Sequence, residues 1–165
     1  MGGGGYRWPA GWPAGVSVGC RMLRLATDAH RQMLAHAIRG YPLEACGLLG
    51  GRVAGGAAGR DDVVRVEQFV PCRNADASAK TYAVGPDGFL AADRQLAPAG
   101  LDVVGVVHSH THTDAYPSPT DIAKGDNPML AGWRFAIVSL RHESPSLRCY
   151  LLDGGVVAEE PVELF

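Results

Sequence analysis

Features that would identify a membrane, nucleic-acid-binding or disulfide-rich protein are absent from this sequence. Its longest apolar runs fall well short of the about 18 residues that a membrane-spanning helix needs, so we expect no membrane span. The formal net charge is −2 at pH 7, which argues against a nucleic-acid partner, because such a partner requires a basic surface. The four cysteines are scattered and form no Cys-x-x-Cys pair. Neither a zinc ribbon nor a dithiol motif is therefore supported, and a reducing cytoplasm is the expected location.

The chain has 165 residues, of which 47% are hydrophobic and 19% are charged, as expected for one soluble globular domain. Its beginning is different, because residues 1–20 are rich in glycine and proline and lack the charged start and apolar centre of a signal peptide. Gly2 is a poor acylation site, because Tyr6 stands where Ser or Thr is needed. We expect residues 1–20 to form a disordered tail and 21–165 to form the domain. Our hypothesis is that Met22, where regular patterning begins, is the native start.

Apolar periodicity and turn residues predict a mixture of helices and strands. Helices are expected at 28–39, after Thr27 as the cap, and at 86–96 and 119–124. Strands are expected at 18–25, 45–51, 63–70, 81–84, 102–110, 135–140, 147–152 and 156–157, with a glycine-rich loop at 52–61 and a polar connection at 71–80. This mixture predicts an α/β sandwich and leaves the strand order open.

The strand predicted at 102–110 ends in two histidines, His108 and His110. Alternate positions of a strand share one face, so the two imidazoles are expected side by side. Ser118 and Asp121 follow in a Ser-Pro-Thr-Asp segment that is typical of a helix start. Two imidazoles and a carboxylate are the ligands of a catalytic zinc that keeps one position open. We predict a metal site of His108, His110 and Asp121; the alternative is strand histidines beside an ordinary capped helix.

This His-x-His-x7-Ser-x-x-Asp pattern resembles the signature of the JAMM (MPN+) metalloprotease family. The segment 44–50 is similar to the Glu-x-x-Gly-x-Leu element of that family, and the likeness extends from about Met22 to the C-terminus. The resemblance implies a curved mixed β-sheet flanked by helices, as in the cytidine-deaminase-like sandwich, and one Zn²⁺ per chain for amide hydrolysis. The stretch 108–121 looks closest to bacterial members that act on ubiquitin-like sulfur carrier proteins. Thr111 stands where many other members have proline.

The resemblance also implies roles for individual residues, each with an alternative. Glu44 would be the general base, and the alternative is a solvated loop carboxylate. Ser118 would donate to the oxyanion, and the alternative is pure helix capping. His112 continues the same strand face if the strand extends that far, so it is either a further metal-site residue or a loop histidine. Cys46 is conceivable as a nucleophile with His108 as its base, but buried strand cysteines are mostly inert.

The implied substrate is the C-terminal amide bond, of peptide or isopeptide type, of a small ubiquitin-like sulfur carrier protein that ends in Gly-Gly. Hydrolysis would release cysteine or a short adduct. Such a tail can add as a strand beside the metal, and the region 74–82 is implied as part of its groove. Only 11 residues separate Asp121 from Trp133, which leaves little room for the insertions with which deubiquitinases of the family grip ubiquitin chains. A homodimer is compatible with the sequence, which does not determine the oligomeric state.

Two other functions stay open at this point. A non-catalytic MPN scaffold would bind partners without a metal, but scaffolds of this kind lack the ligand residues. A different zinc metallohydrolase, such as a phosphoesterase, is suggested superficially by the His-x-His-x-His-x-Asp run at 108–114. Those enzymes need further ligand histidines, and His30, His36 and His142 do not have the required spacing. The sequence does not identify the carrier or the released residue.

Overall fold

The computed structural model describes residues 21–54 and 63–165, so the predicted tail at 1–20 lies outside the described residues. The strands are β1 (Met22–Leu25), β2 (Cys46–Ala54), β3 (Val63–Cys72), β4 (Asp102–His110), β5 (Arg134–Ser139), β6 (Ser146–Asp153), β7 (Val156–Glu160) and β8 (Val162–Leu164). The helices are α1 (Thr27–Gly40), α2 (Pro86–Leu96) and α3 (Pro119–Gly125), with short 3-10 turns η1 (Ala97–Ala99) and η2 (Pro128–Leu130).

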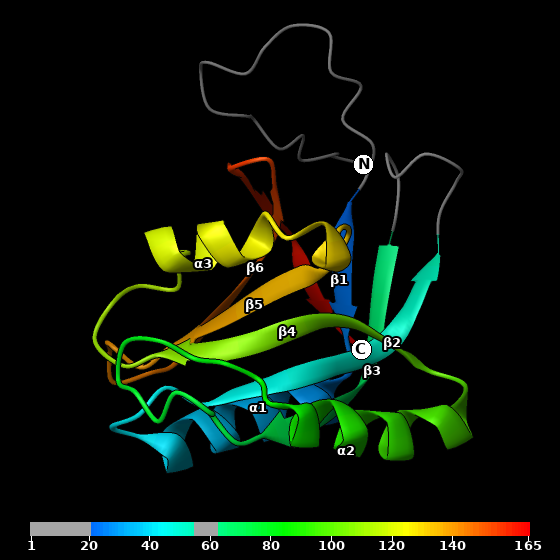
Figure 1. The fold of residues 1–165 in the computed structure, drawn as a ribbon, viewed down its shortest axis with the longest axis horizontal. Helices are drawn as coiled ribbons and strands as arrows, with labels where there is room; N and C mark the ends of the chain where they lie inside the picture. Colours follow the sequence, from blue (N-terminus) through cyan, green and yellow to red (C-terminus); the bar gives the residue numbers. More distant parts are fainter. Residues whose placement is uncertain (1–20, 55–62) are drawn as a thin grey trace, which may run out of the picture.

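All these strands join one mixed sheet in the order β7-β6-β5-β4-β2-β3-β1-β8. Strand β1 runs parallel to β3 and β8, and β4 runs parallel to β5. The remaining neighbours are antiparallel. The sheet is curved and nearly closed, with α1 behind it and α2 and α3 in front (Figure 1). The predicted α/β fold, a curved mixed sheet flanked by helices, is confirmed.

Helix α1 covers one face of the sheet with a regular apolar stripe. Ala29, Met33 and Ala37 recur every four residues, as a helix face requires, and each is 2% exposed. They pack in one hydrophobic cluster with strand residues such as Leu25 and Val66. This face of the sheet is therefore closed by apolar packing.

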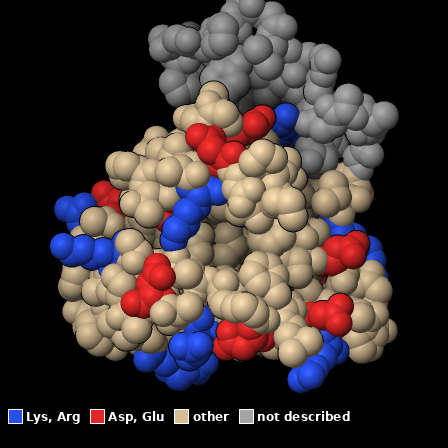
Figure 2. Space-filling view, viewed as in Figure 1, with Lys and Arg blue, Asp and Glu red and all other residues tan. Residues whose placement is uncertain are grey.

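Helices α2 and α3 lie on the opposite face. Ala92 and Leu96 of α2 are buried in a second hydrophobic cluster. Helix α3 approaches β6 so closely that a Cβ atom at Gly125 would lie 2.5 Å from Cβ of Leu152, and glycine permits this approach. The surface on this side is hollowed, mostly between uncharged side chains, with a basic side chain at the rim (Figure 2). The second face is therefore covered only in part.

Two predicted boundaries and one predicted strand are wrong. Strand β2 continues to Ala54 into the predicted loop, whose remainder at 55–61 lies outside the described residues, and β3 continues to Cys72. The segment 81–84 is not a strand, because only Val84 pairs, in an isolated bridge with Asn74. The carbonyl oxygen of residue 81 and the backbone N–H of residue 83 bond instead to the Asn74 side chain.

The two ends of the described domain also differ from prediction. Ala26, not Thr27, precedes α1, and the hydroxyl of Thr27 donates to the main-chain oxygen of Phe165 at 2.9 Å. Strand β7 extends to Glu160, and β8 follows it without having been predicted. Strand β8 is only three residues long and forms by pairing with β1, so its own sequence carries little signal. None of the helices in the described ranges combines the length and the apolarity needed to cross a membrane.

Candidate metal centre and active site

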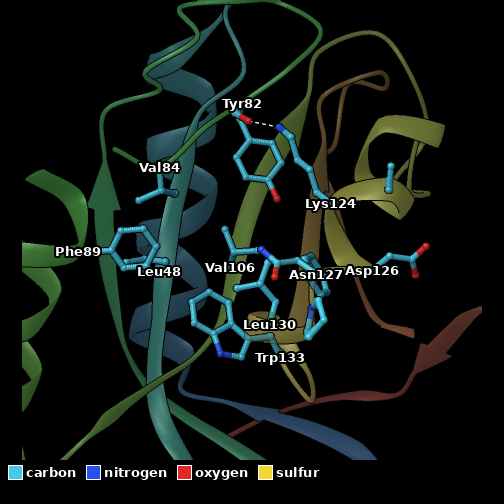
Figure 3. A pocket seen from close by; sticks show the side chains of 13 residues that line it. Leu48, Tyr82, Val84, Phe89, Val106, Lys124, Asp126, Asn127, Leu130 and Trp133 are labelled. Carbon is cyan, nitrogen blue, oxygen red and sulfur yellow. Dashed lines mark hydrogen bonds between the residues drawn. The ribbon is translucent and has the colours of Figure 1, made fainter. Parts of the chain in front are cut away.

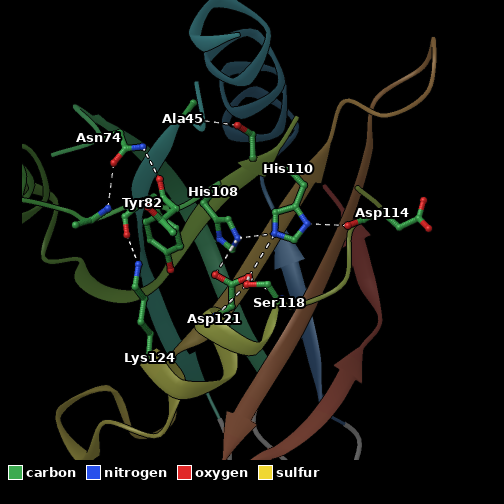
Figure 4. A network of polar contacts seen from close by, with 12 residues as sticks. Ala45, Asn74, Tyr82, His108, His110, Asp114, Ser118, Asp121 and Lys124 are labelled. Atoms are coloured by element: carbon green, nitrogen blue, oxygen red, sulfur yellow. Dashed lines mark hydrogen bonds and ion pairs between the residues drawn. The ribbon is translucent and has the colours of Figure 1, made fainter. Parts of the chain in front are cut away.

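His108 and His110 end β4 and point toward the start of α3 (Figure 4). Their Nε2 atoms are 3.1 Å apart. Oδ1 of Asp121 lies 3.4 Å from Nε2 of His108, and Oδ2 lies 3.4 Å from Nε2 of His110. All three residues are buried, and together they form a group that could hold a metal ion. The structure thus brings together the three residues that the sequence motif nominates as ligands.

The start of α3 holds the Asp121 carboxylate in place. Ser118 is the N-cap, as predicted, and its hydroxyl accepts a hydrogen bond from the backbone N–H of Asp121 at 3.2 Å. In return, Oδ2 of Asp121 accepts from the Ser118 N–H at 2.7 Å and from the Ser118 hydroxyl at 2.6 Å. Pro119 occupies the first helical position, where its ring suits the helix. The carboxylate is therefore fixed by its own helix before any partner binds.

The hydrogen bonds of the imidazoles favour metal binding through Nε2. Nδ1 of His110 donates to the carbonyl oxygen of Asp114 at 2.8 Å, which leaves Nε2 of a neutral ring unprotonated. The ring of His108 stacks on Tyr82, with centroids 4.2 Å apart and planes 17° from parallel. Nδ1 of His108 is buried and makes no hydrogen bond with the described residues. Both rings are thus held with Nε2 facing Asp121.

The charges of the cluster suit a cation. Burial alone would raise the pKa of Asp121, but hydrogen bonds from His108 and His110 outweigh it and hold that pKa well below its usual range. Burial lowers the pKa of His108. Burial also opposes protonation of His110, but the hydrogen bonds to Asp121 and to the Asp114 carbonyl prevail and raise its pKa. A carboxylate that stays ionised between two ring nitrogens is a favourable place for a divalent metal.

Glu44 lies in the short connection between α1 and β2, beside the cluster. Its backbone N–H donates to the Ser78 carbonyl at 2.8 Å. The next residue, Ala45, donates its N–H to the Ser109 hydroxyl at 2.8 Å, so the segment is tied to β4 between the two histidines. Only 6% of Glu44 is exposed, and burial raises its pKa to about 7, with the Asp121 charge adding and His110 opposing. The alternative of a solvated loop carboxylate is therefore wrong.

Two other candidates do not join the metal group. Strand β4 ends at His110, so His112 lies beyond it, exposed, with its ring edge-on to Tyr41 at 5.9 Å. Cys46 is buried in β2, and burial raises the pKa of its thiol to about 12. A thiol that stays protonated at neutral pH is a poor nucleophile, so the structure speaks against the cysteine alternative.

The sequence motif did not nominate two residues that lie beside the cluster, Tyr82 and Lys124. Tyr82 was expected only as the last residue of the groove for the substrate's tail, at 74–82. In the structure, its ring stacks on His108. Lys124 follows Asp121 by three residues on α3; its Nζ donates to the Tyr82 carbonyl and lies 4.4 Å from the centre of the Tyr82 ring. The helical spacing from Asp121 is the one signal that could have nominated Lys124, because residues three apart share a helix face.

A cavity of about 550 Å³ adjoins the cluster at these two residues (Figure 3). Tyr82 and Lys124 form the end of the cavity nearest the metal group, and α2 and η2 supply other walls. Its apolar lining includes Leu48, Val84, Phe89, Leu130, Trp133 and Phe135. An apolar, half-open hollow beside a polar cluster is the usual form of a ligand site.

The curved mixed sheet with a buried His-His-Asp group at a strand end defines a known class of domain. The chain belongs to the family described as prokaryotic homologs of the JAB domain, whose model matches residues 26–152.

Among individual proteins, the chain is 36% identical over 147 residues to the CysO-cysteine peptidase of Mycobacterium tuberculosis, covering 87% of this chain and 91% of the relative. It is 33% identical over 111 residues to the desampylase of Haloferax volcanii, covering 64% and 74%. A solution structure of a protein from Desulfitobacterium hafniense superimposes with a TM-score of 0.72 and 33% identity, covering 87% of this chain and 93% of that one. The family and these relatives support assignment of the chain as a hydrolase.

Proposed function

We propose that this protein is a zinc-dependent peptidase that hydrolyses an amide bond at the C-terminus of a ubiquitin-like sulfur carrier protein and releases cysteine or a short adduct. The observation that carries the proposal is the convergence of His108, His110 and Asp121 beside the buried carboxyl of Glu44. A metal-binding group and a general base with a pKa near neutrality are the two parts that metal-assisted amide hydrolysis needs.

The donor atoms fit zinc. Around a tetrahedral zinc with bonds of about 2.0–2.1 Å, donors stand about 3.3 Å apart. The separations here are 3.1 Å between the two Nε2 atoms, 3.4 Å from His108 to Oδ1 of Asp121 and 3.4 Å from His110 to Oδ2, with the ligand atoms of the group all within 4.8 Å of one another. Three protein donors of this kind also leave one position open, as catalytic zinc sites do. We therefore assign one Zn²⁺ to His108, His110 and Asp121.

Zinc, when bound, polarises the scissile carbonyl and makes water more acidic. Glu44 then accepts the proton of the attacking water and hands it to the leaving amine, which its pKa of about 7 suits in both directions. The hydroxyl of Ser118 accepts from the Asp121 N–H and directs its own proton at Oδ2 of Asp121. If Asp121 served as a metal ligand, the Ser118 hydroxyl could turn its proton from Oδ2 to the developing oxyanion. Capping and catalysis by Ser118 are thus compatible.

The cavity supports a carrier tail as the substrate. A Gly-Gly end allows the backbone to approach the metal closely, because it carries no side chains. The residues before it can pass Tyr82 and Lys124 and place apolar side chains against the cavity wall, with Phe89 from α2 and Trp133 ahead of β5. The similarity to a CysO-cysteine peptidase favours a carrier that bears a C-terminal cysteine. The described cysteines are free thiols, in keeping with the proposed cytoplasmic location.

The test is hydrolysis of a purified carrier-cysteine adduct by the zinc-loaded protein, followed by intact-mass measurement. We expect the loss of one cysteine residue from the carrier. Glu44→Gln should keep zinc and lose the activity, because it removes the base and leaves the ligands in place. An isopeptide conjugate of the same carrier, run in parallel, shows whether the leaving group must be a single residue.

The rival functions give different results in the same preparation. A non-catalytic scaffold would bind no zinc, whereas the proposal requires about one zinc per chain. A phosphoesterase would hydrolyse generic phosphate esters, which the proposed peptidase leaves intact. Full zinc loading with no cleavage of several Gly-Gly carriers would reject the substrate class while leaving the metal site standing.

A further inference from the structure

Two irregular segments lie beside the metal cluster, and strand pairing does not hold them to each other. Glu44 precedes β2, and Tyr82 lies in the connection between β3 and α2. In the described chain, the backbone of residues 76–83 makes no strand ladder with the Glu44 segment. Apart from one backbone hydrogen bond, from the Glu44 N–H to the Ser78 carbonyl, the position of the base relative to the ring stacked on His108 must therefore be set by side-chain contacts.

Asn74 supplies those contacts. It follows β3 and is half-buried. Its Nδ2 donates to the carbonyl oxygen of Glu44 at 3.0 Å and to that of Thr81 at 2.9 Å. Its Oδ1 accepts from the backbone N–H of Asp76 at 3.0 Å and from that of Ala83 at 3.1 Å. Figure 4 shows the Asn74 amide with dashed hydrogen bonds, on the same side of the cluster as Tyr82.

The amide group is used to its full capacity. An asparagine offers two N–H donors and an oxygen with two lone pairs, and all four are engaged here. The bond to Asp76 closes a local turn, which asparagine does in many loops. The bond to Glu44 spans 30 residues, and those to 81 and 83 hold the backbone on both sides of Tyr82. These longer bonds exceed what a turn requires.

The contacts of Asn74 converge on the cluster without touching a metal ligand. Tyr82, between the two residues held by the amide, is buried and stacks on His108. The Glu44 backbone is held from both sides, by Asn74 at its carbonyl and by Ser78 at its N–H. The Asn74 side chain, together with the Glu44–Ser78 backbone hydrogen bond, therefore holds the base and the aromatic wall relative to each other.

We propose that Asn74 is a positioning residue that holds Glu44 and the Tyr82 segment in their working arrangement; its effect on catalysis rests on the proposed function. In a peptidase of this kind, the base must stay within hydrogen-bond reach of the attacking water. A displacement of about 1 Å can cost about 10²-fold in rate. Asn74 acts through Glu44 and not on the substrate.

Asn74→Asp is the sharpest variant. It keeps an oxygen for the N–H groups of Asp76 and Ala83, but it replaces the donor toward Glu44 and Thr81 with a second acceptor facing two carbonyl oxygens. Gln95→Glu is the matched control, because the Gln95 amide bonds to Gln68 and Phe69 away from the site. Asn74→Ala provides a second variant with no new charge.

Hydrogen exchange tests the positioning without any substrate. We expect the Glu44 amide, which donates to the Ser78 carbonyl in the segment that Asn74 holds, to exchange at least about tenfold faster in both Asn74 variants. The Ala83 amide loses its acceptor and should exchange faster only in Asn74→Ala, while Ile137 in the central strand β5 is unchanged in both variants. Gln95→Glu should leave all three amides as they are. Unchanged protection at Glu44 in the folded variants would overturn the proposal.

Turnover of the carrier adduct tests the consequence. We expect kcat to fall about 30-fold or more in Asn74→Asp with full zinc content. The same change should have little effect in the Glu44→Gln background, because the two substitutions act through one group. Lost protection with unchanged kcat would also overturn the proposal. If the wild-type protein cleaves no carrier, the proposed function fails, and the exchange rates alone decide whether Asn74 holds the two segments.

Discussion

The two faces of the sheet differ in the kinds of side chain that they bury. Under α1, residues such as Leu23, Leu25 and Val66 are fully buried in an apolar cluster. Under α2 and α3, a second apolar cluster is accompanied by buried His108 of β4 and Asp121 of α3, beside a half-open hollow. Close apolar packing stabilises a fold, whereas burying ionisable groups costs free energy. The difference indicates that the α1 face carries stability and that the opposite face gives up part of it for chemistry.

The largest expected effect falls on the open face. Asp121→Asn should abolish zinc binding and lower turnover by on the order of 10³-fold or more, about 4 kcal/mol of activation free energy. The amide can still accept from the Ser118 N–H, so the helix cap is kept. Metal analysis and hydrolysis of the carrier adduct measure the effect, with Asp93→Asn on the exposed side of α2 as the control. Retained zinc and activity would remove Asp121 from the metal site.

The next largest effect concerns the sheet face under α1, where a substitution should lower stability and leave zinc binding and activity unchanged. Met33→Ala removes a buried side chain of α1 and should lower the free energy of unfolding by about 3 kcal/mol. Zinc content and kcat should stay unchanged below the melting temperature. Denaturant unfolding measures the loss, and Gln32→Ala, at the exposed neighbouring position, should change stability by less than about 0.5 kcal/mol. Reduced kcat in folded Met33→Ala would show that the two faces are coupled.

Glu44→Gln should stabilise the metal-free protein while it abolishes activity. Burial raises the pKa of Glu44 from 4.5 to about 7, so the folded state retains a proton that the unfolded state releases in this interval. The free energy of unfolding therefore falls as pH rises from about 4.5 to about 7. Glutamine does not titrate, so Glu44→Gln keeps this free energy. Its free energy of unfolding should exceed that of the wild type by about 1–3 kcal/mol at pH values above 7 and should equal it below about 4.5.

Unfolding curves with a chelator, measured across this pH range, test the sign of the effect. Glu163→Gln on the exposed end of β8 is the control, and it should show no comparable gain. Added zinc should reduce the stability difference between Glu44→Gln and the wild type, because a nearby cation favours the ionised carboxylate. Equal stability of the variant and the wild type at high pH would mean that Glu44 is not desolvated.

The smallest expected effect concerns the cavity. Phe89→Ser removes an exposed aromatic wall and should raise KM for a carrier adduct about tenfold, about 1.4 kcal/mol, with kcat unchanged. Val156→Ser, which is also exposed but lies on β7 away from the cavity, is the matched control. An unchanged KM would exclude this wall from carrier binding.

Sequence reasoning succeeded where short-range periodicity decides the structure. The helix at 28–39 and the strand that ends at His110 were predicted because each pattern lies within one element. It failed at 81–84, where a side-chain amide competes for the backbone groups, and at β8, where three residues become a strand only beside β1. In both cases the deciding partner lies outside the segment itself: Asn74, seven and nine residues before its partners at 81 and 83, and β1 at the other end of the described domain.

By itself, the sequence determined the pairing of His108 with His110 and the capped start that holds Asp121, because the period of a strand and the geometry of a helix cap are local. Only the tertiary structure decided that Glu44 is buried beside them, that Tyr82 stacks on His108, and that Asn74 joins these two segments. The physical reason is that burial and long-range hydrogen bonds depend on which strands become neighbours. That order follows from the packing of the whole sheet, and no local pattern contains it.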